Sequence, residues 1–280
     1  DVDDPDLGYT FSTPIIAPVK GSLYYANAPL QNARWVVIFG NGYNNSKPDG
    51  HASTTGHACL YILDAISGTL FKKIDTGVGT TENPNGLASP AVVDVDGDFL
   101  ADYVYAGDLQ GNLWKFDLTS SNISNWDVAY HSANGDPVPL FQATDPEGHP
   151  QPITVMPDVA LHPEHSGIGF IKDHLGNITI DFLNTYMVYF GTGKYIYASD
   201  TTDTQVQTFY GIWDYGESLG TFDRTSNSPR LLEQTISLDT TSFSTPVRLV
   251  SDNPITWFVT DPNGDPVRYH VGWYEDLVVN

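Results

Sequence analysis

The chain has 280 residues, and its 34 acidic side chains outnumber its 12 basic ones, which gives a formal net charge of −22. Such a charge repels the phosphates of nucleic acids and of anionic lipids, so it argues against nucleic-acid partners and favours divalent cations or basic proteins. Cys59 is the only cysteine, which rules out an internal disulfide and any metal site built from paired cysteines.

The sequence contains no uninterrupted apolar run of about 18 residues, and its first residues are acidic rather than basic and apolar. We therefore expect neither direct membrane insertion nor a signal peptide within these residues. Both ends read like the interior of a longer chain. We expect the parent protein to continue in both directions and to hold any targeting signal there.

Apolar runs of strand length, rich in β-branched and aromatic residues, alternate with turns marked by 25 glycines and 19 prolines. No amphipathic helix of ten or more residues is evident, so the sequence predicts an all-β protein. In chain order, we interpret the following runs as strands or strand pairs: STPIIAPV (12–19), RWVVIFGNG (34–42), CLYILDAISGTLFKKIDTG (59–77), ASPAVVDVDG (88–97), DYVYAGDLQGNLWKFDL (102–118), YMVYFGTGKYIY (186–197) and TFYGIWDYG (208–216).

Several runs share one pattern, in which an apolar strand closes in a glycine-containing turn, as in VVIFGNG, DYVYAGDLQG and MVYFGTG. Four-stranded units of roughly 40 to 50 residues, repeated with variation, are typical of β-propellers. We predict a modified β-propeller that forms a single domain over residues 1–280, and a β-sandwich is the alternative. The expected blade-like units are about four, at about 9–76, 86–143, 151–215 and 229–275, with loop or hairpin insertions at about 40–58, 119–150 and 162–182.

The segment DVDGDFLAD, residues 94–102, places four aspartates close together, and no lysine or arginine stands beside them in the sequence. In a strand, side-chain alternation would send Asp94, Asp96 and Asp98 to the same face, where their charges would repel one another. Either a cation neutralises these carboxylates, or the segment is not a strand.

Calcium prefers six to eight oxygen ligands, and a loop of this spacing can supply most of them by curling round the ion. We predict a calcium site, with magnesium the weaker candidate because it prefers a tight octahedron and retains its waters. The expected ligands are the side chains of Asp94, Asp96 and Asp98 at loop positions one, three and five, the backbone carbonyl of Leu100 at position seven, and Asp102 as a bidentate ligand at position nine.

Phe99 departs from the usual pattern, because calcium loops of this kind place glycine at position six for a sharp turn. The alternative to a metal site is a solvated acidic turn. His162 and His165, in HPEH, lack helical spacing and a third ligand, so we interpret this stretch as a surface loop. The motif GTGKY, at 191–195, reads as a β-turn between strands rather than a phosphate-binding loop.

No recognisable catalytic motif of hydrolases, zinc proteases or nucleotide-binding enzymes occurs, so we expect a protein without enzymatic activity. One alternative is a quinone-dependent dehydrogenase, because LYILDAISGTLFKKID is similar to the blade repeats of that propeller family. A second alternative is a carbohydrate-binding propeller. For Trp114, Tyr189, Trp213 and Trp273, we favour packing between blades over a carbohydrate platform.

Five segments, in order along almost the whole chain, resemble the C-terminal propeller domain of the PilC/PilY family of bacterial type IV pilus tip-associated proteins. They are DPDLGYTFSTP (4–14), VVDVDGDFLADYVYAGDLQGNLWKFDL (92–118), YMVYFGTGKYIYASD (186–200), QTFYGIWD (207–214) and GWYEDL (272–277). The resemblance implies a role in pilus biogenesis, adhesion, twitching motility and virulence. It also implies a location at the bacterial cell surface or pilus tip, associated with the outer membrane after export.

The partners implied by the resemblance are type IV pilus proteins, in particular minor pilins, and host-surface receptors. Family members bind calcium in an aspartate-rich loop of the propeller, and calcium occupancy opposes pilus retraction. That loop corresponds to Asp94, Asp96, Asp98, Leu100 and Asp102 in this sequence.

Overall fold

The computed structural model describes residues 4–21, 33–43, 45–46, 52–172, 178–242 and 245–277, with the backbone alone at 165–172 and 178–184. Strands dominate these residues, and the helices among them are two 3₁₀ turns, η2 (Ile123–Asn125) and η3 (Ala198–Thr202). Neither turn has the length or the apolar character needed to cross a bilayer. The expectation of an all-β chain is confirmed.

The first sheet is a four-stranded antiparallel meander in the order β1-β2-β3-β4. Alternate residues of the second strand, Val36 and Ile38, are fully buried, as a half-buried strand requires. A tight turn joins the last two strands, in which the Asp64 carboxylate accepts backbone N–H groups and Gly68 has a positive φ. The strands are β1 (Ile15–Val19), β2 (Arg34–Gly40), β3 (Cys59–Asp64) and β4 (Leu70–Asp75).

The second sheet has the order β15-β11-β7-β6-β5, and a further strand, β8, also pairs with β7. The predicted insertion at 119–150 contains η2, two of these strands and a separate hairpin, β9–β10. The strands are β5 (Ala91–Val93), β6 (Tyr103–Gly107), β7 (Asn112–Asp117), β8 (Asp127–Val128), β9 (Tyr130–His131), β10 (Pro137–Val138), β11 (Phe141–Gln142) and β15 (Gly220–Thr221).

The third sheet has the order β12-β13-β14-β21-β16, and two further hairpins, β17–β18 and β19–β20, follow β16 along the chain. The insertion expected at 162–182 is the continuation of two long paired strands, and its expected turn, at 176–177, lies outside the described residues. The strands are β12 (Asp158–Lys172), β13 (Ile178–Gly191), β14 (Gln207–Asp214), β16 (Leu232–Gln234), β17 (Ile236–Asp239), β18 (Val247–Val250), β19 (Phe258–Thr260), β20 (Pro266–Arg268) and β21 (Gly272–Leu277).

The unit expected at 229–275 differs from the structure, because the described part of this stretch forms no separate four-stranded sheet. Its strands β16 and β21 join the third sheet, where β21 pairs antiparallel with β14. Trp273 lies opposite Gly211 in this pairing, and a Cβ atom at Gly211 would come within 2.5 Å of the indole Nε1. The tryptophan therefore fits against β14 only because position 211 carries no side chain.

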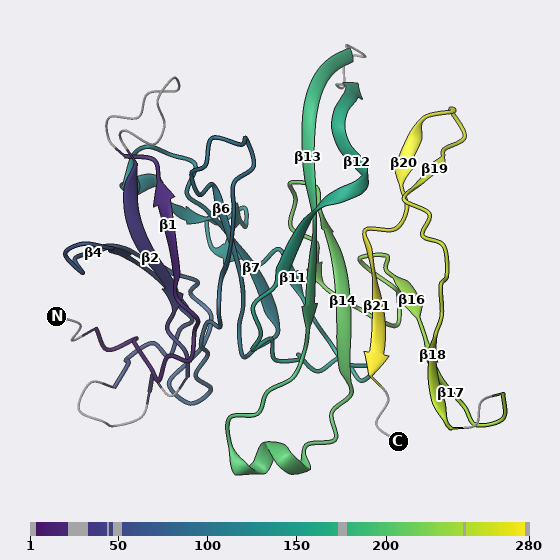
Figure 1. Ribbon diagram of the computed structural model, residues 1–280, viewed down its shortest axis with the longest axis horizontal. Helices are drawn as coiled ribbons and strands as arrows, with labels where there is room; N and C mark the ends of the chain where they lie inside the picture. Colours follow the sequence, from purple (N-terminus) through teal and green to yellow (C-terminus); the bar gives the residue numbers. More distant parts are fainter. Residues whose placement is uncertain are drawn as a thin grey trace.

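The three sheets follow one another across the molecule, and the second sheet is covered on both faces (Figure 1). One cluster of buried side chains joins the first and second sheets, and includes Ile38, Leu60 and Trp114. A second cluster joins the second and third sheets, and includes Phe141 and Tyr210. Face-to-face packing of successive antiparallel sheets is the arrangement of blades in a propeller.

Of the four aromatic residues expected in the core, Trp114 and Trp213 are buried, whereas Tyr189 and Trp273 are half-buried. A buried ion pair also links the second and third sheets, since Nζ of Lys115 lies 2.7 Å from Oδ2 of Asp214. Tyr105 and Tyr130 donate hydrogen bonds to the same carboxylate. The contact between these two sheets is therefore polar as well as apolar.

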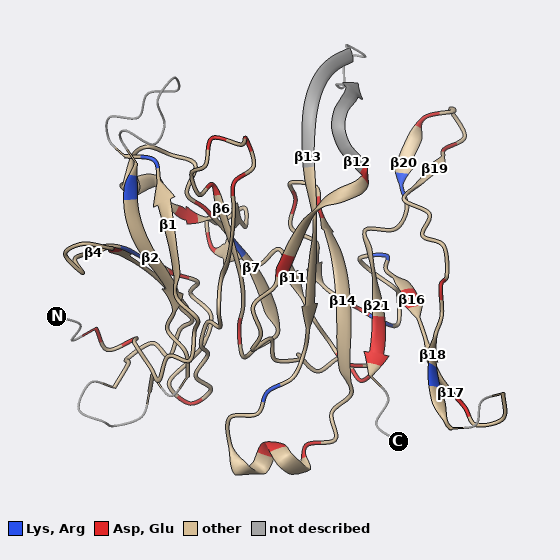
Figure 2. Ribbon diagram, in the orientation of Figure 1, with Lys and Arg blue, Asp and Glu red and all other residues tan. Residues whose placement is uncertain are grey.

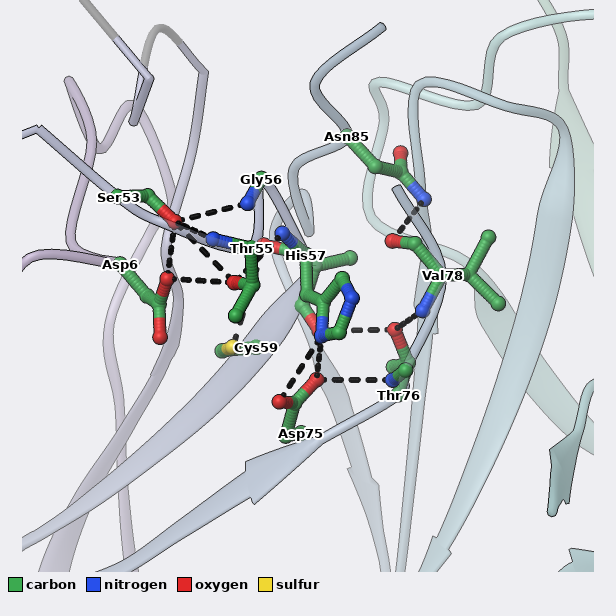
Figure 3. A network of polar contacts seen from close by, with 12 residues as sticks. Asp6, Ser53, Thr55, Gly56, His57, Cys59, Asp75, Thr76, Val78 and Asn85 are labelled. Atoms are coloured by element: carbon green, nitrogen blue, oxygen red, sulfur yellow. Dashed lines mark hydrogen bonds and ion pairs between the residues drawn. The ribbon is translucent and has the colours of Figure 1, made fainter. Parts of the chain in front are cut away.

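A polar network fixes the N-terminal segment to the first sheet (Figure 3). The Asp6 carboxylate accepts hydrogen bonds from the hydroxyls of Ser53 and Thr55 and lies 2.6 Å from Nζ of Lys73. These contacts lower the pKa of Asp6, although burial acts in the opposite direction. The charged N-terminal segment is thereby held against the first sheet.

Candidate metal centre

The aspartate-rich segment is a loop between β5 and β6, and not a strand. Its carboxylates accept backbone N–H groups that follow them in the chain: Asp94 from Gly97 at 2.7 Å and from Phe99 at 2.8 Å, and Asp96 from Asp98 at 3.1 Å. These local bonds curl the backbone and draw the acidic side chains toward one another. Because the segment is a loop, its aspartates do not alternate along a strand. The repulsion expected among carboxylates on one strand face therefore does not arise in that form.

Three carboxylates converge at the centre of this loop. One oxygen atom from each of Asp94, Asp96 and Asp102 lies within 4.8 Å of the other two. Asp102 is 1% exposed, whereas Asp94 and Asp96 are exposed. The group is therefore buried on the side of Asp102 and open to solvent on the side of the other two. Oxygen atoms at this separation can bind one hard cation together.

Asp102 is fixed from several directions. Its backbone N–H donates to the carbonyl of Val93, its carbonyl accepts from Leu118, and its side-chain Oδ2 accepts from the N–H of Val95 at 2.9 Å. These bonds connect the end of the loop to β5 and to the segment that follows β7. The carboxylate is therefore held in place by the sheet itself.

Asp98 is not one of the three converging carboxylates. The Asp98 carboxylate accepts the N–H of Leu100 at 2.9 Å, and its Oδ2 lies 4.0 Å from Nζ of Lys20. The Leu100 side chain is buried, which agrees with a role limited to its backbone carbonyl. That Asp98 and Leu100 bind the ion stays a prediction.

Lys20 was not expected here, and the inference that no basic residue pairs with the aspartates is wrong. Its ammonium nitrogen lies 3.0 Å from Oδ1 of Asp102, 3.8 Å from Oδ2 of Asp96 and 4.0 Å from Oδ2 of Asp98. Lys20 directly follows β1, whose Pro18 carbonyl accepts the N–H of Ala101. Strand pairing in the first sheet therefore brings this lysine to the loop, and neighbouring sequence gives no sign of it.

The pKa values reflect this crowding of charge. The pKa of Asp96 is raised, first because the loop partly desolvates this otherwise exposed carboxylate and further because Asp102 and Asp98 repel it. For Lys20, burial alone would lower the pKa, yet the hydrogen bond and charge of Asp102 raise it, helped by Asp96 and Asp98. The loop carries four carboxylates, and one ammonium lies within 4.0 Å of three of them, so net negative charge remains for a further cation.

Phe99 provides the sharp turn that glycine usually provides. Its φ of 67° lies in the left-handed region, as does the φ of 78° at Gly97, and its side chain is 72% exposed. A bulky residue in this conformation costs roughly 1–2 kcal/mol. The loop therefore closes with Phe99 in place of glycine, at the expense of local backbone strain.

The other sequence candidates do not join this group. His162 is fully buried in β12, between the rings of Trp213 at 4.7 Å and Trp257 at 4.4 Å between centroids, so the surface-loop interpretation is wrong for it. The aromatic neighbours, which lie far away in the sequence, stabilise this position. The side chain of His165 lies outside the described residues.

Sheets of mostly antiparallel strands that pack face to face in succession define an all-β protein of the propeller class. A family model described as the PilY1 β-propeller domain matches residues 2–247. The chain belongs to this family. Membership confirms the family resemblance that the sequence showed, and it confirms the predicted propeller fold. The alternative of a β-sandwich is therefore rejected.

Three relatives illustrate the similarity. The chain is 37% identical to the type IV pilus biogenesis factor PilY1 of Pseudomonas aeruginosa strain PAO1 over 298 residues, covering 99% of this chain and 22% of that protein. It is 35% identical to a PilY1 homolog of Xylella fastidiosa over 285 residues, covering 99% and 16%. A crystal structure of the Pseudomonas aeruginosa PilY1 C-terminal domain superposes with a TM-score of 0.71 at 32% identity, covering 99% of this chain and 52% of that one.

The chain spans about a fifth of the length of these curated relatives. Their family comprises pilus biogenesis factors rather than enzymes, so the chain is assigned no enzymatic activity. This assignment argues against the quinone-dependent dehydrogenase alternative.

Proposed function

We propose that the chain is the calcium-binding propeller domain of a type IV pilus biogenesis factor. The observation that carries the metal part of this proposal is the convergence of carboxylate oxygens from Asp94, Asp96 and Asp102 within 4.8 Å of one another. The pilus part is supported by family membership and by relatives named as type IV pilus biogenesis factors.

The donor set fits calcium. Every candidate ligand is an oxygen atom, and calcium accepts six to eight such ligands in irregular geometry, whereas magnesium demands a near-ideal octahedron. Asp94, Asp96 and Asp102 would hold the ion, and Asp98 and the Leu100 carbonyl would complete its protein ligands. When bound, the ion would supply positive charge that relieves repulsion among the carboxylates.

The chain's own residues connect this loop to two sheets. Asp102 belongs to the loop of the second sheet, whereas Lys20 and Pro18 lie at the end of the first sheet, and both contact the loop. Occupancy of the loop would therefore stabilise the contact between two neighbouring blades. In this proposal, the ion sets the rigidity of a surface that pilus proteins recognise.

The biological role that follows is support of pilus biogenesis, twitching motility and adhesion, with calcium occupancy opposing retraction. Minor pilins and host-surface receptors are the proposed partners, and the bacterial surface or pilus tip is the proposed location. The names of the relatives support the connection to type IV pili.

The test combines thermal melting with a cellular assay. Calcium should raise the melting temperature of the unaltered chain, because an ion that binds only the folded state stabilises it by mass action. Asp94→Asn and Asp96→Asn should remove this shift, while Asp136→Asn, which alters an exposed acid in another loop, should keep it. In cells that carry the full-length protein, Asp94→Asn should change twitching and surface piliation, and unchanged behaviour would contradict the biological part.

A further inference from the structure

A second candidate site lies in the third sheet, away from the aspartate loop. A cavity of about 520 Å³ is lined by residues of β12, β16 and β21 and by the segment that runs from the end of β18 to Trp257, just before β19. The lining includes Trp257, Trp273 and Glu275. Pockets of roughly 300 to 1,000 Å³ are the size that binds small molecules or single side chains. The aromatic rings, amides and carboxylates of its lining indicate which ligands it could bind.

Two tryptophans contribute aromatic rings to the apolar part of this cavity, beside aliphatic residues such as Val250 and Ile255. Trp273 is half-buried, lies against the backbone of Gly211, and contacts the ring of Phe209 at 5.8 Å between centroids. Trp257 is 6% exposed, and its ring lies 5.6 Å from that of Trp213. Both indoles are therefore held by packing before any ligand arrives, and aromatic faces attract cations.

The amide donors in the lining are already engaged. Nε2 of Gln234 donates to the carbonyl of Asn253 at 2.9 Å, and Nδ2 of Asn253 donates to the carbonyl of Glu233 and to the hydroxyl of Ser251. These bonds hold the loop after β18 against β16. The two amides serve the protein's own structure.

One carboxylate oxygen of the lining is not engaged in this way. Oε1 of Glu275 is buried and has no hydrogen-bond partner within the described parts of the chain. Glu164 and Asp252 add two exposed carboxylates to the lining, and no lysine or arginine is among the described residues that line it. A buried carboxylate oxygen without a partner is costly, and a ligand that donates a hydrogen bond would satisfy it.

We propose that this cavity binds the side chain of a lysine or arginine from a partner polypeptide. Such a side chain carries positive charge and offers only donors, which matches three carboxylates and two tryptophan rings. A neutral sugar would leave the three carboxylates without a counter-charge, whereas a basic side chain supplies one, and the amides of Gln234 and Asn253 already donate to acceptors of the protein itself. Figure 2 shows acidic positions on the neighbouring strands β16 and β21, where a basic partner would approach.

The proposal is tested with blocked tripeptides and NMR of the indole N–H signals. Acetyl-Gly-Lys-Gly-amide should shift the Trp273 signal, identified with Trp273→Phe, in a saturable manner, and the norleucine analogue should not. Glu275→Gln should weaken binding of the lysine peptide about tenfold, the effect of losing one charge-assisted hydrogen bond. Its melting temperature should stay the same or rise, because the partnerless charge has gone.

Glu147→Gln is the matched control, because it removes an exposed carboxylate from a hairpin loop outside the cavity lining, and it should leave binding unchanged. Equal binding of the lysine and norleucine peptides would overturn the proposal. So would binding of methyl glucoside in place of the lysine peptide, or the absence of a saturable shift with both the lysine peptide and its arginine counterpart, acetyl-Gly-Arg-Gly-amide. None of these outcomes depends on calcium or on the aspartate loop.

Discussion

The ammonium group of Lys20 lies 3.0 Å from Oδ1 of Asp102, although 82 residues separate the two in the sequence. The pair joins the end of β1 to the last residue of the aspartate loop, and Asp102 is almost fully buried. A cation at this point is therefore part of the contact between the first and second sheets. Calcium would act on the same contact.

Removal of this lysine should make the fold depend more on calcium. We expect Lys20→Met to destabilise the calcium-free chain by about 2 kcal/mol, because a buried carboxylate loses a charged hydrogen bond. Calcium should restore most of that loss, and its affinity should increase about tenfold, since one competing positive charge has gone. Chemical denaturation with and without calcium checks both statements. Lys194→Met, which removes a lysine beside Asp200, is the control and should show neither effect.

The backbone at Phe99 offers a test of strain. Its positive φ is adopted readily by glycine and not by other residues. We expect Phe99→Gly to be more stable than Phe99→Ala by about 1 kcal/mol, since both lose the exposed ring but only glycine relieves the strain. Urea denaturation of the two variants measures this difference. Equal stability would show that the turn is not strained.

The calcium effect should depend on pH in a defined direction. The folded-state pKa of Asp96 is raised, so the calcium-free fold gains relative stability when this group is protonated and loses it as the pH rises through that pKa. Calcium needs the charged carboxylate. The calcium-induced rise in melting temperature should therefore be full near pH 7 and shrink as the pH falls toward about 4. A shift that grows on acidification would contradict this assignment.

The buried pair of Lys115 and Asp214 should stabilise the contact between the second and third sheets. We expect Lys115→Met to cost about 3–5 kcal/mol, because it leaves a buried carboxylate without its cation. Asp214→Asn combined with Lys115→Met should cost less than the sum of the single changes, because the double variant leaves no buried charge without a counter-ion. Tyr105 and Tyr130 donate to different oxygens of the carboxylate, so the amide oxygen retains one of these two hydrogen bonds. A double-mutant cycle by denaturation measures this coupling. Additive costs would show that the pair does not act as a unit.

Features that depend on neighbouring residues could be predicted from the sequence. The turn at Asp64 and Gly68 is one example, because the carboxylate caps the following amides within a few residues. The grouping of Asp94 and Asp96 is another, since their spacing already places them in one loop. In both cases the interactions that fix the structure are local.

Features that depend on distant pairing could not be predicted in this way. Lys20 reaches the aspartates only after β1 has paired in the first sheet. Strand β21 pairs with β14, where Trp273 lies over Gly211, and His162 is buried by tryptophans from other elements. No nearby residue signals these contacts, so the sequence pattern suggested a fourth blade-like unit and a surface histidine.

The most direct test of the account is calorimetric titration of calcium into the calcium-free domain. We predict saturable binding of one ion per chain, with binding lost in Asp94→Asn and Asp96→Asn and retained in Asp136→Asn. Measurement at two ionic strengths would separate a specific site from diffuse attraction to an acidic surface. Absence of saturable binding in the unaltered chain, or its full retention in Asp94→Asn and Asp96→Asn, would contradict the assignment of this loop as a calcium site.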